Sequence, residues 1–307
     1  MKYFLAIPLI LASFFAQASE FDAYSCGKNY SALIIEDKSG EVVFQKRAAS
    51  YAYPASLIKL MTLYLTFEAL EEKKLKFEQI ITVSERGEEI AAVNKVNTMR
   101  LKQGDKISVR NAIEAVIVKS FNEAAIVLAE AVAGNEWEFV NKMNKKAAQL
   151  GMTNSSFRNS TGLHEEGQYT TAFDLARLAK AIRKDFPQYY HLFSLKKFNY
   201  LNSKYETHNH VLVSYKGAEG LKTGFTNASG FNLISAAKNG DKRLISVVLG
   251  CESVLKRDEL TKKLLNDGFK ELSAKAKNAT IFSFLSLGFG YESGYEGEFE
   301  GEMMFGN

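Results

Sequence analysis

The sequence predicts an α/β (α+β) fold, with an antiparallel sheet built from both ends of the chain and flanked by helices. Three observations predict it. Strand-like segments occur near the start of the chain, strand-like segments return near its end, and helical spacing of apolar residues dominates the stretch between them. A helical lobe is therefore expected as an insertion, at about residues 80–210. With 307 residues and 46% hydrophobic residues, the chain can bury a large core.

The first strands are predicted at residues 30–36 and 42–45, around a Lys38-Ser39-Gly40 turn. A helix is expected directly after Pro54, because proline disfavours a helical residue before it and is tolerated at a helix start. The residues that follow are apolar on nearly every side, which predicts a buried helix. Ser56 should lie at its N-terminus, where free N–H groups and the helix dipole favour negative charge.

The middle of the chain has a helical pattern from about Ile80 to Gln149. Residues 109–130 form an apolar-rich stretch, and residues 137–150 predict an amphipathic helix that ends at Gly151. A further helix is expected at residues 171–184, stopped by Pro187.

Strands return at residues 220–223, 231–237 and 243–249, the last two joined by an Asn239-Gly240-Asp241 turn. A final helix is expected at about residues 256–272. These strands and the first hairpin would form one sheet from opposite ends of the chain.

The two ends of the chain suggest export and a tail. Met1-Lys2, an apolar run to Phe15 and Ala16-Gln17-Ala18 have the three regions of a signal peptide, so residues 1–18 should be cleaved after Ala18. The apolar run is short for a membrane span, and no second stretch of spanning length occurs. We therefore expect an exported, periplasmic protein without a transmembrane anchor, with a catalytic domain at residues 19–280.

Residues 281–307 contain Gly, Glu and aromatic residues and are predicted to be a flexible tail. The first residues of this tail are apolar, and the sequence leaves two alternatives for them: they add a strand to the sheet, or they pack on the surface of the catalytic domain. The tail carries five Glu and no Lys or Arg, so the net charge of +4 leaves +9 on residues 1–280. A basic body suits an anionic polymer, although many soluble proteins carry such a charge.

Only two cysteines occur, Cys26 and Cys251, so the chain is not a disulfide scaffold. An oxidising compartment would permit a bond between them. Two separate thiols are at least as well supported by the sequence, because bonding needs Cα atoms within about 7 Å.

Three short motifs indicate the chemistry. Ser56 and Lys59 are three residues apart, so on a helix they share one face and the lysine amine can reach the serine hydroxyl. A lysine whose pKa is lowered by burial or neighbouring cations can activate a serine nucleophile. Ser120-Phe121-Asn122 and Lys222-Thr223-Gly224 follow, and their order and separation match the S-x-x-K, S-D-N and K-T-G set.

With these motifs the chain resembles the serine D-alanyl-D-alanine carboxypeptidases among the low-molecular-mass penicillin-binding proteins. Three longer blocks, at residues 53–62, 167–176 and 220–233, strengthen the resemblance, which covers roughly residues 28–275. It implies a β-lactamase/transpeptidase-like fold with the active site in a cleft between two lobes. It also implies peptidoglycan stem peptides as substrates and β-lactam antibiotics as inhibitors, with no nucleic-acid partner and no cofactor.

The resemblance assigns roles to the first two motifs. Ser56 would attack the carbonyl of the penultimate D-alanine, and Lys59 would accept its proton. Ser120 would pass the proton to the leaving amine, while Asn122 would hold the peptide amide and the Lys59 ammonium. Phe121 departs from the small or acidic residue that relatives usually carry, so its ring would either narrow the pocket or pack in the helical lobe.

The third motif would face the serine from a strand. Lys222 would lower the pKa of Lys59 by like-charge repulsion, and Gly224 would let the acyl group approach the backbone. The N–H groups of Ser56 and Phe225 would form the oxyanion hole. Thr223 and Arg257 would bind the terminal carboxylate of the substrate. For Arg257, a solvated position at the start of the last helix is an equally supported alternative.

The four histidines raise the question of a metal site. His208 and His210 flank Asn209, and an H-x-H pair can bind zinc, but no third ligand is evident and we predict no metal. By resemblance, residues 208–212 would form the strand before the K-T-G motif, with His208 near the carboxylate end of the cleft.

The favoured function is a serine carboxypeptidase that releases the terminal D-alanine through a Ser56 acyl-enzyme. An endopeptidase that cuts D-alanyl cross-links would use the same residues and is the first alternative. A β-lactamase is less favoured, because residues 159–170 lack the E-x-x-L-N signature of class A enzymes. An inactive cell-wall binding protein is disfavoured by the complete set of motifs.

Overall fold

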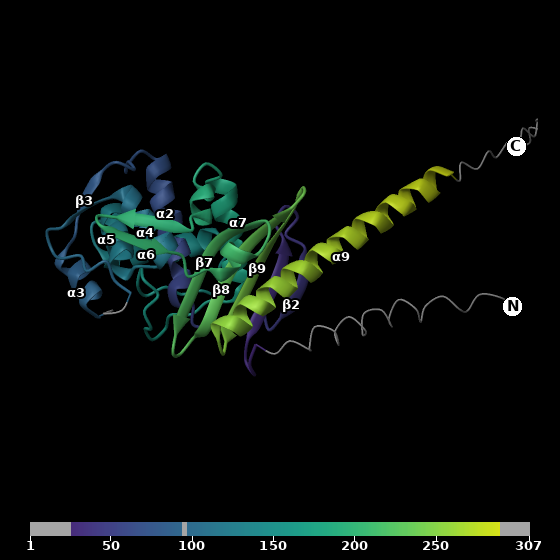
Figure 1. Cartoon of the computed structure of the whole chain (residues 1–307), viewed down its shortest axis with the longest axis horizontal. Coiled ribbons are helices and arrows are strands. Elements are labelled where there is room, and N and C mark those ends of the chain that lie inside the picture. Colours follow the sequence, from purple (N-terminus) through teal and green to yellow (C-terminus); the bar gives the residue numbers. More distant parts are fainter. Residues whose placement is uncertain (1–25, 94–96, 289–307) are drawn as a thin grey trace, which may run out of the picture. The chain divides into compact units, whose positions relative to one another are not determined.

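A five-stranded antiparallel sheet with strand order β2-β1-β9-β8-β7 forms the framework (Figure 1). The structure is a computed structural model that describes residues 26–93 and 97–288. The bounds of the strands are Ser31–Glu36 for β1, Val42–Lys46 for β2, Ala218–Thr226 for β7, Gly230–Asn239 for β8 and Lys242–Cys251 for β9. Because β1 pairs with β9, the two ends of the domain share one sheet, and the predicted fold class is confirmed.

Both faces of the sheet are covered at its centre, which explains why β1, β8 and β9 are buried along most of their length. Leu33 and Ile35 on β1 pack in the main hydrophobic core with the helical part of the chain. Ile34, between them, points to the other face. There it meets helix α9, Val254–Gly288, whose Gly268 comes close to Ile34 and to Leu244 of β9.

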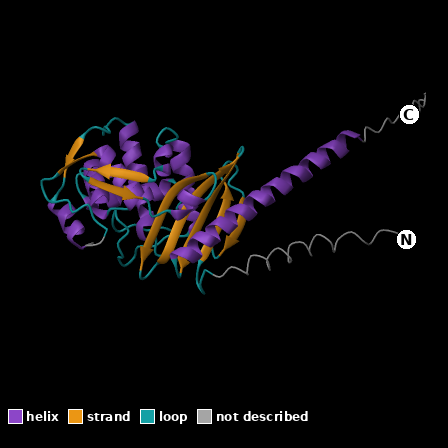
Figure 2. Ribbon diagram, in the orientation of Figure 1, coloured by secondary structure: helices purple, strands orange, loops and turns teal. Residues whose placement is uncertain are grey.

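The helices from the middle of the chain lie together on one side of the sheet in Figures 1 and 2. A short 3-10 helix, η1 (Ala55–Ile58), leads into α2, Lys59–Glu71, which is buried on nearly every side as predicted. Three further helices begin at side-chain caps that accept a backbone N–H: Ser108 for α4, Asn135 for α6 and Thr171 for α7. The bounds are Val109–Lys119 for α4, Asn122–Ala133 for α5, Glu136–Gln149 for α6 and Ala172–Asp185 for α7.

The stretch from Ile80 to Gln149 is not helical throughout, so that prediction was partly wrong. Strand β3, Ile80–Thr82, pairs with β4, Lys106–Ser108, and the helix α3, Glu85–Val93, lies between them. A second hairpin, β5 (Lys197–Tyr200) with β6 (Ser203–Glu206), follows the 3-10 helix η2, Tyr190–Ser194. Strands of three or four residues are too short to show an alternating pattern in the sequence.

Residues 208–212 do not form the strand that the resemblance implied. They lead into a short helix, α8, His210–Ser214. The side chain of Asn209 accepts the N–H of Leu212 at 3.1 Å, and this local cap competes with an extended backbone.

The last helix is longer than predicted, since α9 continues to Gly288 instead of ending near residue 272. It therefore includes residues 281–288, the start of the expected tail, and residues 289–307 lie outside the described residues. The chain divides into two compact units, residues 1–269 and 270–307.

A disulfide bond joins Cys26, before β1, to Cys251 at the end of β9, with Cα atoms 4.9 Å apart. The pairing left open by the sequence is thus present. Within the described residues, no helix has the length and apolar character needed to cross a membrane. The predicted signal peptide, residues 1–18, falls outside the described part of the chain.

Candidate active site

A cleft of about 510 Å³ collects most of the residues that the motifs predicted. It lies among η1, the α4–α5 turn, β7 and the start of α9. The predicted residues that line it are Ser56, Ser120, Asn122, Thr223, Gly224, Phe225 and Arg257. Lys59 and Lys222 are buried directly behind this lining.

Ser56 and Lys59 contact each other as their spacing predicts. Ser56 lies in η1 and Lys59 is the first residue of α2, which places Lys59 Nζ 3.0 Å from Ser56 Oγ. The Lys59 side chain is completely buried. Its Nζ also donates to Asn122 Oδ1 at 2.7 Å and to the backbone carbonyl of Thr161.

The surroundings of Lys59 favour its neutral form. Burial first, and the Lys222 cation second, hold the pKa of Lys59 well below its usual range, while Glu123 opposes the shift. A neutral amine has two N–H donors and one lone pair. With Asn122 and Thr161 as acceptors for the donors, the lone pair faces the Ser56 hydroxyl, as a general base requires.

The second motif is placed by the turn between two helices. Ser120 ends α4 in the left-handed conformation, with φ +62°, and Asn122 is the first residue of α5. This tight turn presents both side chains to the cleft. The Ser120 hydroxyl is buried and has no hydrogen-bond partner among the residues that the structure describes, so it can bond to a bound group.

Phe121 does not narrow the cleft, because its ring is turned into the helical lobe. The side chain is 1% exposed and does not line the cleft. It packs edge-to-face on Tyr205 of β6, with ring centroids 5.1 Å apart. Of the two readings that the sequence left open, the structure shows core packing.

The third motif lies on β7, an edge strand of the sheet. Lys222 is buried, and burial together with the nearby Arg257 cation lowers its pKa to about 7. Gly224 lies against the Ser56 turn, since a Cβ at this position would be 3.1 Å from the Ser56 backbone nitrogen. The missing side chain therefore makes room for the nucleophile's own backbone, a contact that the sequence reading did not foresee.

The far end of the cleft carries positive charge. Arg257 is 3% exposed, and its guanidinium donates to Asp258 Oδ1 at 2.9 and 2.7 Å. It is a buried, oriented side chain and not a solvated one. His208 contacts Lys119 Nζ through its Nε2 atom. Burial, and then the neighbouring cations, lower the pKa of His208 to about 4, so its imidazole is neutral at pH 7.

The loop at residues 159–163 completes the surroundings of Lys59, and the motif search missed it. Asn159 Oδ1 accepts bonds from the Thr161 N–H, the Thr161 hydroxyl and the Gly162 N–H, which fixes the Thr161 carbonyl. Gly162 has φ +82°, and a Cβ there would be 2.0 Å from the carbonyl oxygen of Ala55. Every residue has a backbone carbonyl, so no sequence motif identifies the Thr161 carbonyl as an acceptor. Only the local Asn-Ser-Thr-Gly pattern could have indicated a turn here.

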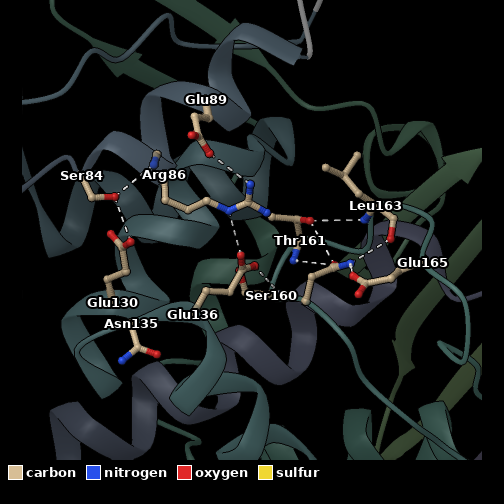
Figure 3. Close-up of polar contacts among 12 residues, drawn as sticks. Ser84, Arg86, Glu89, Glu130, Asn135, Glu136, Ser160, Thr161, Leu163 and Glu165 are labelled. Carbon is tan, nitrogen blue, oxygen red and sulfur yellow. Dashed lines mark hydrogen bonds and ion pairs between the residues drawn. The ribbon is translucent and has the colours of Figure 1, made fainter.

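A chain of polar contacts ties this loop to the helical lobe (Figure 3). Glu136 Oε1, at the start of α6, accepts the N–H and the hydroxyl of Ser160 at 3.0 and 2.8 Å. Arg86 Nε of α3 donates to the second oxygen of Glu136 at 3.2 Å. On the other side, the Thr62 hydroxyl of α2 donates to the Ser160 carbonyl at 2.7 Å.

No group of three or more His, Cys, Asp and Glu side chains within residues 26–93 and 97–276 is arranged to hold a metal ion. His208 and His210 have other partners: Lys119 contacts His208, and His210 Nδ1 lies 3.2 Å from Asp258 Oδ2.

Comparisons with known proteins identify the family. A family model described as D-alanyl-D-alanine carboxypeptidase matches residues 21–253. D-alanyl-D-alanine carboxypeptidase DacC of Escherichia coli (strain K12) is 37% identical over 241 residues, covering 78% of this chain and 60% of the relative. DacF of Bacillus subtilis (strain 168) is 35% identical over 250 residues, covering 78% of this chain and 62% of the relative. The chain thus spans about three fifths of the length of these curated relatives.

Solved structures are similar over the same region. Penicillin-binding protein 6B from Escherichia coli superposes with a TM-score of 0.73 at 35% identity, covering 77% of this chain and 75% of that one. Penicillin-binding protein D2 from Listeria monocytogenes, in its ampicillin-bound form, superposes with a TM-score of 0.68 at 30% identity. That match covers 78% of this chain and 96% of the Listeria chain.

Proposed function

Because this chain belongs to the D-alanyl-D-alanine carboxypeptidase family, we propose that it removes the terminal D-alanine from peptidoglycan stem peptides through a Ser56 acyl-enzyme. The observation that carries the proposal is the contact of 3.0 Å between Ser56 Oγ and a buried Lys59 amine. The cleft beside this pair holds a buried arginine, Arg257, suited to a terminal carboxylate.

In the acylation step, Lys59 Nζ takes the proton of the Ser56 hydroxyl as Oγ bonds to the carbonyl carbon of the penultimate D-alanine. The backbone N–H groups of Ser56 and Phe225 are proposed to bind the oxygen that becomes negative. The proton then passes through the Ser120 hydroxyl to the nitrogen of the terminal D-alanine, and the C–N bond breaks. Asn122 holds Lys59 in place and can bond to the substrate amide.

In the second step, water attacks the ester and releases the shortened peptide, and the Ser56 hydroxyl is restored. Lys59 is again the group placed to take the proton from the attacking water. Thr223 and Arg257 are proposed to bind the carboxylate of the terminal D-alanine, at the end of the cleft where Lys222 adds positive potential.

β-Lactam antibiotics are proposed to acylate the same serine. Support comes from the Listeria penicillin-binding protein D2, which was solved with ampicillin bound and is similar over 78% of this chain. Residues 159–170 lack the E-x-x-L-N signature of class A β-lactamases. The two acidic residues in this segment, Glu165 and Glu166, are not among the residues that line the cleft. We therefore expect the penicilloyl ester to be hydrolysed slowly, unlike that of a β-lactamase.

Export to the periplasm is also proposed. The Cys26–Cys251 disulfide supports it, because such bonds persist in oxidising compartments. If residues 1–18 are a signal peptide, the intact mass of the exported protein should correspond to a chain that begins at Ser19. A periplasmic form that retains Met1 would contradict cleavage.

The activity is tested by incubating the purified protein and its Ser56→Ala variant with intact muropeptides and separating the products. Ser56-dependent release of free D-alanine from monomeric pentapeptides is the expected result. Conversion of cross-linked dimers to monomers without release of D-alanine would instead identify an endopeptidase. No Ser56-dependent change in either substrate would contradict both activities.

A further inference from the structure

A second hollow lies beside the cleft, and it is lined by tyrosines. We call it the tyrosine groove; it has a volume of about 340 Å³ and is lined by Tyr51, Ala52, Tyr53, Gly167, Gln168 and Tyr169. The three tyrosine side chains remain 66%, 45% and 38% exposed. Exposed aromatic residues are usually scattered singly, so three around one hollow indicate a binding surface.

The rings are held in place before any ligand binds. Ala52 and Thr170 pair through two backbone hydrogen bonds of 2.9 and 3.0 Å, which sets Tyr51 beside Tyr169. Their ring centroids are 5.0 Å apart in an edge-to-face arrangement. The Tyr51 hydroxyl donates to Asn154 Oδ1 at 3.3 Å. A fixed aromatic surface loses little conformational entropy when it binds a ligand.

The chemistry of the groove suits a neutral, amphipathic ligand. None of its six lining residues carries a formal charge at neutral pH. Tyrosine offers a flat apolar face and a hydroxyl at its edge. A sugar ring matches both, because one face of a pyranose presents C–H groups and its rim presents hydroxyl and amide groups. The six lining residues offer no charge to a phosphorylated or strongly charged ligand, and one cation, the Arg158 guanidinium, lies against Gly167.

The groove adjoins the cleft through one loop. Gln168 lines the groove, and its buried side-chain amide donates to the Leu163 carbonyl at 2.8 Å. Leu163 lines the cleft. The next residue, His164, packs edge-to-face on Tyr53 with ring centroids 4.8 Å apart. A substrate that leaves the cleft past Leu163 would therefore reach the tyrosines.

We propose that the tyrosine groove binds sugar rings of the glycan strand to which the stem peptide is attached. This inference rests on the proposed function, which makes the substrate a peptide branch of a polysaccharide. The groove would place a glycan-linked peptide in the cleft, and it would give no such help to a free peptide.

Binding is tested with the full-length Ser56→Ala protein and peptide-free glycan strands of alternating N-acetylglucosamine and N-acetylmuramic acid. The muramic acid carboxyl groups of these strands are converted to amides, so that the probe is neutral as the peptide-linked glycan is at this position. The titration is followed by calorimetry or NMR. When Tyr51→Ala and Tyr169→Ala are introduced together into this parent protein, binding should weaken about five- to tenfold, the size expected from the lost ring contacts. Tyr51→Phe keeps the ring but loses the hydroxyl bond to Asn154, so it should lose less affinity than Tyr51→Ala. Trp137→Ala, which removes an exposed aromatic residue outside the groove, is the matched control. No binding by the parent, or equal binding by the Tyr51→Ala, Tyr169→Ala protein, would overturn the proposal.

Turnover provides a second readout with Ser56 restored. The ratio of kcat/KM for disaccharide pentapeptide to that for sugar-free pentapeptide should fall in the Tyr51→Ala variant and stay unchanged in Trp137→Ala. An unchanged ratio in Tyr51→Ala would contradict the groove's role. If glycan strands bind but neither pentapeptide releases D-alanine, the proposed function fails and the groove proposal holds. If D-alanine is released but glycan strands do not bind, only the groove proposal fails.

Discussion

At the scale of single residues, the proposed chemistry depends on two buried lysines with lowered pKa values. Lys59 contacts the Ser56 hydroxyl, and Lys222 is buried on β7 next to Thr223, which lines the cleft. Burial is the largest cause of both shifts, and the charge of Lys222 adds to the shift of Lys59. Each lysine is thus tuned by its surroundings, and the coupling can be tested by pH.

The first prediction concerns the pH dependence of acylation. Lys59 must be neutral to act, so the acylation rate should fall as pH drops through its lowered pKa. Lys222→Gln removes a cation that lowers this pKa, so the acid limb of the profile should move to higher pH. The effect should be largest below pH 7, where Lys222 itself is protonated, because its pKa is about 7.

The measurement is the second-order rate constant for labelling by a fluorescent penicillin between about pH 5 and 9, a range centred on the Lys222 pKa of about 7. Lys216→Gln, at an exposed lysine just before β7, is the matched control and should leave the midpoint in place. A midpoint that stays fixed or moves to lower pH in Lys222→Gln would refute the coupling.

The second prediction concerns stability. The pKa of Lys222 is about 7 in the folded protein and about 10.4 when unfolded. Between these values the unfolded chain binds more protons, so the free energy of unfolding should rise with pH across this window. Lys222→Met should reduce the slope of the free energy of unfolding against pH by up to about 1.4 kcal/mol per pH unit. Urea unfolding at several pH values checks it, with Lys216→Met as control, and equal slopes for wild type and Lys222→Met would count against a depressed pKa.

The contact between Ser56 and Lys59 could be predicted from the sequence, because motif spacing reports which residues are neighbours on a helix. Ser56 and Lys59 meet as their i, i+3 spacing requires. The orientation of Phe121 and the burial of Arg257 could not be predicted, since both depend on which distant residues surround the side chain. For Phe121 that neighbour is Tyr205, on a hairpin that the sequence pattern did not indicate.

At the scale of elements, the loop at residues 159–163 decides how Lys59 is oriented. It presents the Thr161 carbonyl to Nζ and is held by Asn159 from within and by Glu136 from α6. The Gly162 backbone lies against the carbonyl of Ala55, so the loop and the nucleophile's turn are packed as one unit. Loosening the loop should therefore disturb the orientation of Lys59.

The third prediction follows from this packing. Glu136→Ala leaves the Ser160 N–H and hydroxyl without their acceptor, which should lower the free energy of unfolding by about 1–3 kcal/mol. The penicillin acylation rate should fall as well, and the midpoint of its pH profile should shift, because the Thr161 carbonyl is no longer fixed. Glu136→Gln keeps an acceptor and should recover most of the rate.

Glu138→Ala is the control for this set, because Glu138 is an exposed carboxylate on the same first turn of α6. Stability is measured by urea unfolding and acylation by penicillin labelling over pH. A Glu136→Ala protein that loses stability but keeps the wild-type pH midpoint would show that the loop is structural only.

The short strands and the C-terminal helix mark where element prediction fails. The hairpins β3–β4 and β5–β6 are too brief for a periodic pattern. The strand expected at residues 208–212 is a helix start, because the Asn209 side chain caps it. Helix α9 continues to Gly288, beyond the point where the sequence suggested an end.

At the scale of the whole molecule, the domain is closed by contacts between its two ends. Strand β1 pairs with β9, and the Cys26–Cys251 disulfide fastens the same two segments across a sequence separation of 225 residues. A sheet drawn from both ends could be predicted from where the strand patterns occur. The disulfide could not, because the distance between two cysteines is set by the register of the folded sheet.

The fourth prediction is the contribution of this bond. A cross-link that closes so long a loop limits the unfolded chain most strongly, so Cys26→Ser with Cys251→Ser should lower the free energy of unfolding by about 2–5 kcal/mol. Urea unfolding of wild-type protein with and without reductant provides the comparison. Reduction should destabilise the wild type and leave the double variant unchanged; a reductant effect on the double variant would point to another cause.

The central claim is that Ser56, activated by Lys59, is the residue that becomes acylated. Mass spectrometry after exposure to benzylpenicillin tests it most directly. The wild-type protein should gain the mass of one penicilloyl group, located on the peptide that contains Ser56, and Ser56→Ala should gain none. An adduct on another residue, or one that persists in Ser56→Ala, would contradict the account.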